Sequence, residues 1–276
     1  MEKRRNLPRI CLLLTAALTL LGVALRSVCM LRCFDTDIGY FAEGPLPLLS
    51  NVLYFAAVLI PTVCMAITPK DVLPAELHTP GRAPAAILLG LSLAVFTIIS
   101  LLICFPARKS NTMLASSLLG LLASTYYFLS ARRDGRYPDW LSFLGFLPVF
   151  WSIAAVADTY FDQYTTMNSP VKIALQIGFI GFMTISLAEL RFRVDKVMPR
   201  YSVAFLAVGS YACLVGSIPL LIAACVGIVD QLRHAMYASV LLCAGLYGFY
   251  LLFRYTVSPA PSESPAESLA TPNTAE

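Results

Sequence analysis

The chain has 276 residues, of which 58% are apolar and 13% are charged, with a net charge of +4. Soluble globular domains carry roughly a quarter of charged residues, so this balance excludes an ordinary soluble domain and predicts a protein dissolved in lipid. The small positive charge does not indicate a nucleic-acid partner, because most basic residues fall in segments expected to face the cytoplasm.

Eight apolar stretches are long enough to cross about 30 Å of hydrocarbon, which takes about 20 helical residues. They cover 10–31, 47–68, 84–104, 112–131, 140–158, 171–190, 201–227 and 234–253. Because backbone groups in lipid must be hydrogen-bonded internally, runs of this length without apolar–polar alternation favour helices over a barrel. The sequence therefore predicts an all-α, polytopic integral membrane protein whose main partner is the lipid bilayer.

The placement of the basic residues predicts the orientation. With the N-terminus in the cytoplasm, most of the 20 Lys and Arg residues lie in cytoplasmic segments. This bias predicts that both termini face the cytoplasm, N-in and C-in, and that the number of spans is even. A bacterial plasma membrane is the expected location.

The second and sixth spans carry an internal similarity. Segments 45–74 and 170–199 both begin and end with proline, and an amide side chain stands at the same place in each, Asn51 and Gln176. Each segment closes with a charged pair followed by Val. We therefore predict two tandem four-helix units, 1–131 and 132–255. Two units with even numbers of spans form a parallel repeat, with a pseudo-twofold axis along the membrane normal.

The loops after the first and fifth spans predict a ligand site on the outer side. Each opens with an aromatic residue followed by an acid, Asp35 and Asp162. Facing each other across the axis, these two carboxylates would bind a cation or an amine; the alternative is that both are solvated loop acids. Asn51 and Gln176 lie one turn deeper, where two amides are expected to hydrogen-bond to each other and fasten the units together.

Charged residues at bilayer depth are few. Glu189 lies near the inner end of the sixth span with Arg193 four residues later, a favourable order for a helical ion pair. Arg26 lies near the outer end of the first span, where its long stem can reach the interface. We interpret all three as interfacial anchors, and their rarity argues against an ion-coupled carrier.

The sequence shows no catalytic motif, so we expect no catalytic residue, no cofactor and no metal. His78 and His234 are the two histidines, and they are expected on opposite sides of the membrane. Cys29 and Cys33 lie four residues apart on one helical face, and whether they form a disulfide is left open. The other six cysteines are interpreted as small apolar residues.

The last segment, 256–276, is rich in Pro, Ser, Glu and Thr and predicts a disordered cytoplasmic tail. Two functional hypotheses remain for the membrane part. The first is binding or transport of a small solute or lipid at the seam between the two units. The second is a non-catalytic structural or sensory membrane component. A fully packed seam favours the second hypothesis, and a water-accessible cavity counts against it.

Overall fold

The computed structural model describes residues 7–67, 83–107, 111–132, 139–194, 198–229 and 231–257. Eight spans in these residues are long and apolar enough to cross a membrane. Seven are single helices: α2 (Leu7–Arg32), α3 (Pro45–Ile67), α4 (Ala83–Ala107), α5 (Asn111–Ala131), α8 (Pro170–Arg193), α9 (Pro199–Cys225) and α10 (Leu232–Val257). The fifth span consists of α6 (Asp139–Leu144) and α7 (Leu147–Tyr160). The prediction of an all-α, multi-pass membrane protein is confirmed.

The fifth span is broken between α6 and α7. Pro148 stands in the first turn of α7, where its missing N–H needs no helical partner. Gly145 precedes it, and its N–H bonds the carbonyl oxygens of Leu141 and Ser142 at 3.2 and 3.1 Å. The span therefore enters the bundle as a short helix followed by a longer one.

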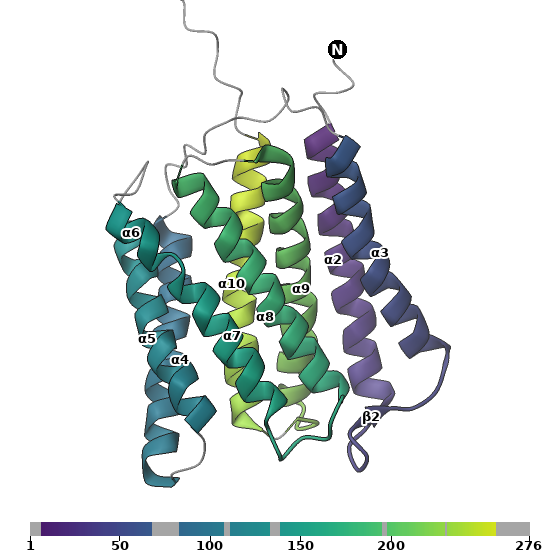
Figure 1. The fold of residues 1–276 in the computed structure, drawn as a ribbon. Coiled ribbons are helices and arrows are strands. Elements are labelled where there is room, and N and C mark those ends of the chain that lie inside the picture. The colour runs from purple at the N-terminus through teal and green to yellow at the C-terminus, as the bar shows by residue number, and fades with distance from the viewer. Residues whose placement is uncertain are drawn as a thin grey trace, which may run out of the picture.

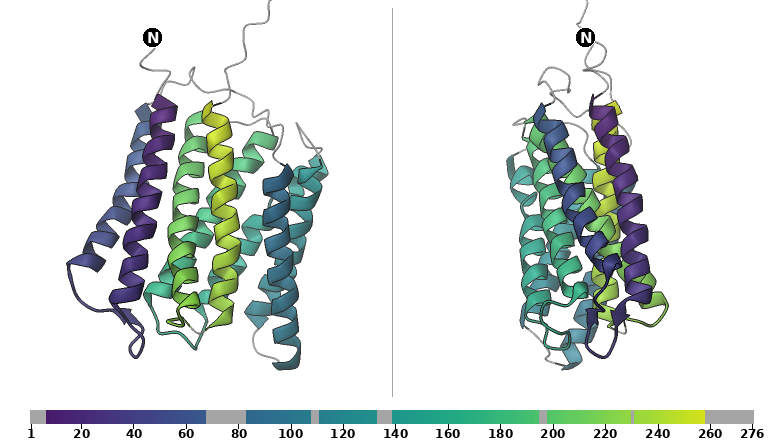
Figure 2. Two further views of the ribbon diagram at one scale, coloured as in Figure 1. Left: turned by 180° about the vertical axis from the view of Figure 1, so that it is seen from behind. Right: turned by 90° about the vertical axis from the view of Figure 1, so that its right-hand side faces the viewer.

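The second half of the chain forms the middle of the bundle (Figures 1 and 2). Helices α8, α9 and α10 pack against one another, and α7 packs against α8. The α2–α3 pair lies on one side of this group, where both helices contact α9. The α4–α5 pair lies on the other side, where α4 contacts α10 and α5 contacts α7.

This arrangement differs between the two halves of the chain. Helix α8 packs extensively along α9, whereas α3 and α4, the pair in the equivalent positions, lie on opposite sides of the central helices (Figures 1 and 2). The tandem units 1–131 and 132–255 and the pseudo-twofold axis therefore stay predictions from the sequence.

Helix α2 begins and α10 ends at the same end of the molecule (Figure 1). The connecting residues 33–44, 161–169 and 226–229 lie at the opposite end, which we call the loop end. This geometry agrees with an even number of crossings, and the side on which each end lies stays a prediction. Helix α10 includes Thr256 and Val257, and the remainder of the predicted tail lies outside the described residues.

The interior is filled by an aromatic cluster around Trp151, which is completely buried. Its ring meets those of Phe96, Phe179, Phe182 and Tyr237 at centroid distances of 5.9, 5.6, 5.4 and 6.3 Å. These five residues, which we call the aromatic cluster, come from α4, α7, α8 and α10. Edge-to-face contacts of this kind stabilise beyond the area that they bury, so the cluster holds four helices together.

Candidate functional site

A cavity of about 280 Å³ lies at the loop end. It is an open pocket lined by residues from the α2–α3, α7–α8 and α9–α10 connections, together with the first residues of α8 and α10. Its polar side chains are Thr36, Asp37, Thr165, Thr166, Gln231 and His234. Its apolar wall includes Phe34, Val171, Ile228 and Val229. We call this space the loop-end cavity.

One wall of the cavity is a small β-hairpin, in which β1 (Phe34–Asp35) pairs with β2 (Tyr40–Phe41). The Asp35 carboxylate accepts hydrogen bonds from the backbone N–H groups of Asp37 and Ile38, at 2.9 and 3.3 Å. Gly39 closes the turn with a φ of 74°, a conformation that favours glycine. Asp35 therefore fixes the turn that presents Asp37.

The hairpin is held against the α7–α8 connection. The Tyr40 hydroxyl donates a hydrogen bond to the carbonyl oxygen of Met167. A Cβ atom at Gly39 would lie 2.6 Å from Oγ1 of Thr166, so glycine also permits the two loops to touch. Segments that are more than 120 residues apart in the chain thus form one wall.

His234 lies at the floor of the cavity and is 1% exposed. Its Nε2 is 3.4 Å from Oδ2 of Asp162, which is itself 6% exposed. The same carboxylate pairs with Nη2 of Arg233 at 2.6 Å through Oδ1 and accepts a hydrogen bond from the Thr165 hydroxyl at 2.7 Å. Asp162 is therefore a buried anion held by three side chains.

The environment of Asp162 keeps its carboxyl group ionised. Burial by itself raises the pKa of this group. The adjacent His234 ring, the hydrogen bond from Thr165, the positive charge of Arg233 and the Tyr164 N–H act in the opposite direction and outweigh it. As a result, the pKa of Asp162 lies well below its usual range.

This shift predicts acid sensitivity. Because the pKa of Asp162 is depressed in the folded state, its contribution to stability is present above the usual Asp value of about 3.9 and is lost as the pH falls below it. We expect the melting temperature of the purified protein to decrease with pH below about 4, and Asp162→Asn to flatten this decrease. Glu43→Gln, at an exposed acid of the α2–α3 loop, should keep the wild-type slope. An unchanged acid slope in Asp162→Asn would contradict the assignment.

A second buried carboxylate, Asp158, lies at the end of α7 and is 1% exposed. Its Oδ2 accepts a hydrogen bond from the Tyr237 hydroxyl at 2.8 Å, and its Oδ1 accepts one from Thr112 at 2.8 Å. Nη1 of Arg233 lies 3.7 Å from Oδ2. The Arg233 guanidinium is thus shared by Asp158 and Asp162.

Lys172 completes the set of charges. Its side chain is buried, and Nζ donates to the backbone carbonyl oxygen of Asp162 at 2.5 Å. Two acidic side chains, Asp158 and Asp162, therefore lie with two basic side chains, Lys172 and Arg233, and with His234. We call these five residues the charge network. It joins α7, α8 and α10 and continues through Tyr237 into the aromatic cluster.

The structure separates the two acids of the predicted site. Asp162 belongs to the charge network, Asp35 is exposed and fixes its own turn, and neither lines the loop-end cavity. Asp37, two residues after Asp35, provides the carboxylate that does line it. A joint ligand site of Asp35 and Asp162 therefore stays a prediction, whereas the carboxylate and the imidazole that line the cavity belong to Asp37 and His234.

The two amides of the predicted site also have different surroundings. Oδ1 of Asn51 accepts a hydrogen bond from Nη1 of Arg26 at 3.3 Å, and Gln176 is half-buried on α8. The expected hydrogen bond between Asn51 and Gln176 is not formed, because α3 packs mainly against α2 and α9 and not against α8.

The interpretation of Glu189 and Arg193 as interfacial anchors is wrong. Their exposed fractions are 2% and 5%, and Oε1 of Glu189 accepts a hydrogen bond from the Tyr247 hydroxyl at 2.7 Å. Sequence reasoning placed Asp158 and Arg233 on the outer side but did not pair them, and it gave His234 no role. The sequence did carry a signal for this pairing. The outer end of the fifth predicted span carries two acids, Asp158 and Asp162, and the outer end of the eighth carries a basic pair, Arg233 and His234.

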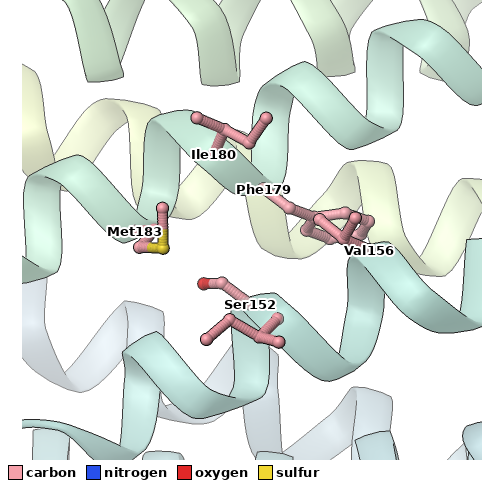
Figure 3. A pocket seen from close by; sticks show the side chains of 6 residues that line it. Ser152, Val156, Phe179, Ile180 and Met183 are labelled. Atoms are coloured by element: carbon pink, nitrogen blue, oxygen red, sulfur yellow. The ribbon is translucent and has the colours of Figure 1, made fainter.

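A second, smaller depression of about 170 Å³ lies between α7 and α8. Figure 3 shows Ser152 and Val156 of α7 facing Phe179, Ile180 and Met183 of α8. The Ser152 hydroxyl already donates to the Pro148 carbonyl oxygen at 2.8 Å, and Ile180 is half exposed. This depression is an apolar part of the outer surface of the bundle and provides no polar contact for a solute.

Cys29 and Cys33, whose pairing the sequence left open, are free thiols in the structure. Their helical relation is retained, since the Cys33 N–H donates to the Cys29 carbonyl oxygen at 2.9 Å. The chain matches no family model, no curated protein and no solved structure.

Proposed function

We propose that this membrane protein binds a small, polar, amine-bearing solute in the loop-end cavity. The observation that carries the proposal is the cavity itself, which places the Asp37 carboxylate and the His234 ring around one space. Ligand sites for drug-sized molecules occupy roughly 300–1,000 Å³. A volume of about 280 Å³ lies just below that range, which favours a small solute.

The chemistry of the wall favours an amine. Among the described residues that line the cavity, Asp37 is the one acid, and hydroxyl and amide groups surround it. A protonated amine can pair with the carboxylate and donate to the neighbouring oxygens, and charge-assisted hydrogen bonds are about twice as strong as neutral ones. Asp35 supports this role because its two hydrogen bonds hold Asp37 in place.

The proposal is tested by thermal stability in detergent with choline, ethanolamine and putrescine as probes and glycerol as the neutral control. A ligand that binds the folded state alone raises the melting temperature with its concentration. We expect at least one amine to do so. Asp37→Asn should weaken its apparent affinity by about tenfold, the loss of one charged hydrogen bond.

Glu43→Gln provides the matched control, because Glu43 is an exposed acid of the same loop that does not line the cavity. This variant should keep the wild-type affinity. If no amine raises the melting temperature, or if Asp37→Asn responds like the wild type, the proposed ligand class is wrong.

A second candidate function is a sensory or structural component that binds without transport. The observation that favours it is the aromatic cluster, which fills the interior beneath the charge network. Uptake of the stabilising amine into proteoliposomes distinguishes the two. Uptake that Asp37→Asn abolishes would support transport, whereas binding without protein-dependent uptake would support the sensory or structural role.

We also propose a non-catalytic role for the site. The polar groups beneath the cavity are engaged with one another: His234 with Asp162, and Asp162 with Arg233. This arrangement suits a rigid floor more than an activated nucleophile.

A further inference from the structure

Four polar residues meet at the seam between α2, α3 and α9. Arg26 comes from α2, Asn51 and Tyr54 come from α3, and Tyr211 comes from α9. Asn51 and Tyr54 are three positions apart and so lie on one helical face. The seam lies at one edge of the bundle, away from the loop-end cavity's charge network on α7, α8 and α10 (Figure 1).

Gly22 makes room for the Tyr211 side chain. A Cβ atom at Gly22 would lie 2.9 Å from the Tyr211 hydroxyl oxygen, so a larger residue there would displace it. Gly22 is one helical turn from Arg26 on the same face of α2. The Tyr54 and Tyr211 rings are in edge contact, with their centroids 5.4 Å apart.

Arg26 carries a positive charge that no acid compensates. Its guanidinium donates to the Asn51 amide oxygen at 3.3 Å and lies 4.7 Å from the centre of the Phe41 ring. Both partners are neutral, and within the described chain no acidic side chain pairs with it. Arginine stays protonated, and an unpaired charge within a membrane span is costly.

The two tyrosine hydroxyls in the seam are buried and have no hydrogen-bond partner among the described residues. Tyr211 is 1% exposed. A buried donor without an acceptor is destabilising, so the seam holds a cation and two donors that lack an anionic acceptor.

We propose that Arg26, Tyr54 and Tyr211 bind a phosphate group. One anionic oxygen can pair with the guanidinium and accept hydrogen bonds from the two hydroxyls, which satisfies all three groups at once. Arginine is suited to phosphate because its donors form a fixed fork. The site opens outward at Asn51, which is exposed, and its neighbours Val52 and Phe55 are 57% and 70% exposed.

The depth of the site fits a phospholipid headgroup. Helix α2 has 26 residues and is therefore about 39 Å long, compared with about 30 Å of hydrocarbon. Arg26 lies six residues before the end of α2, which places its backbone a few ångströms inside the hydrocarbon boundary. From there its side chain can extend to the phosphate level of the bilayer. The other source of the same group is free phosphate.

The test measures the melting temperature of the full-length protein in a neutral detergent. The probes are dioctanoylphosphatidylglycerol, dioctanoylglycerol, which has the same chains without the phosphoglycerol headgroup, and inorganic phosphate. We expect the phosphatidylglycerol to raise the melting temperature with concentration and dioctanoylglycerol not to do so. A shift of the same size with inorganic phosphate would assign the site to the soluble anion.

Two variants test the residues. Arg26→Gln and Tyr211→Phe should each weaken the apparent affinity for the phosphate probe by about tenfold. Arg32→Gln, at an exposed residue that ends the same helix, should stay within about twofold of the wild type. Tyr211→Phe removes only an unpartnered hydroxyl, so its melting temperature without a probe should equal or exceed that of the wild type.

If Arg26→Gln fails to fold, the comparison of Tyr211→Phe with the wild type still tests the proposal. The proposal is overturned if neither phosphate probe stabilises the wild type, if dioctanoylglycerol stabilises it equally, or if Tyr211→Phe retains the wild-type response. None of these results depends on an amine in the loop-end cavity, so the two sites are tested separately.

Discussion

Replacement of Arg233 by methionine is expected to cost about 3–5 kcal/mol of unfolding free energy, the usual penalty for removing one partner of a buried ion pair. Arg233 lies 2.6 Å from Asp162 and 3.7 Å from Asp158, and the side chains of both acids are at most 1% exposed. Without the guanidinium, two buried carboxylates lose the cation that they share. Lys172 does not replace it, because its Nζ donates to the backbone carbonyl oxygen of Asp162 and not to a carboxylate.

The measurement is equilibrium unfolding in mixed micelles, monitored by the fluorescence of Trp151 in a Trp140→Phe background shared by all variants. A triple variant, Arg233→Met with Asp158→Asn and Asp162→Asn, removes the cation and both anions together. We expect it to regain much of the lost stability, because neutral groups in place of a buried ionic set are often tolerated. Arg32→Gln is the control for loss of an exposed arginine and should cost less than about 0.5 kcal/mol.

Two results would contradict this account of Arg233. If the unfolding free energy of Arg233→Met lies within about 1 kcal/mol of the wild-type value, water compensates the two carboxylates. A triple variant less stable than the single one would mean that the acids stabilise the fold without Arg233. Either result would mean that the charge network does not stabilise the loop-end cavity.

The spans could be predicted from the sequence because apolar length is a local property. The stretch 84–104 was expected, and α4 extends over Ala83–Ala107. The neighbours of each span could not be predicted in this way. Lipid and protein interior are both apolar, so the hydrophobic pattern of a membrane helix does not specify which face meets which helix. Partners are set by small residues, shape and a few polar contacts.

The candidate site shows the same limit. Asp162 was identified as an important acid from its place after the fifth span, but its assigned partner was Asp35. In the structure its partners are Arg233 and His234, which belong to the eighth span. Only the packing of α10 against α8 and α9 brings these residues to the end of α7. Similarly, Asn51 was paired with Gln176 through the predicted repeat, whereas the fold places it beside Arg26.

A close backbone approach of α8 and α9 gives the second large effect. A Cβ atom at Gly209 would lie 2.6 Å from the Gly181 carbonyl oxygen, and one at Gly181 would lie 2.8 Å from the Gly209 carbonyl oxygen. Both obstacles are backbone atoms, which cannot rotate away as a side chain can. Gly209→Ala is expected to cost about 1–3 kcal/mol, the range for overpacked sites, and Gly209→Val more.

The comparison that isolates this contact is Gly44→Ala, since the nearest atom to a Cβ at Gly44 is Cδ of Pro47 at 4.0 Å. This variant should unfold like the wild type in the same micelles, whereas the Gly209 series should lose stability in the order Gly, Ala, Val. Equal stability across the series would show that α8 and α9 can separate freely. That outcome is not expected, because α9 also contacts α2, α3 and α10, and moving it away from α8 would disturb the Tyr54–Tyr211 seam on its other side.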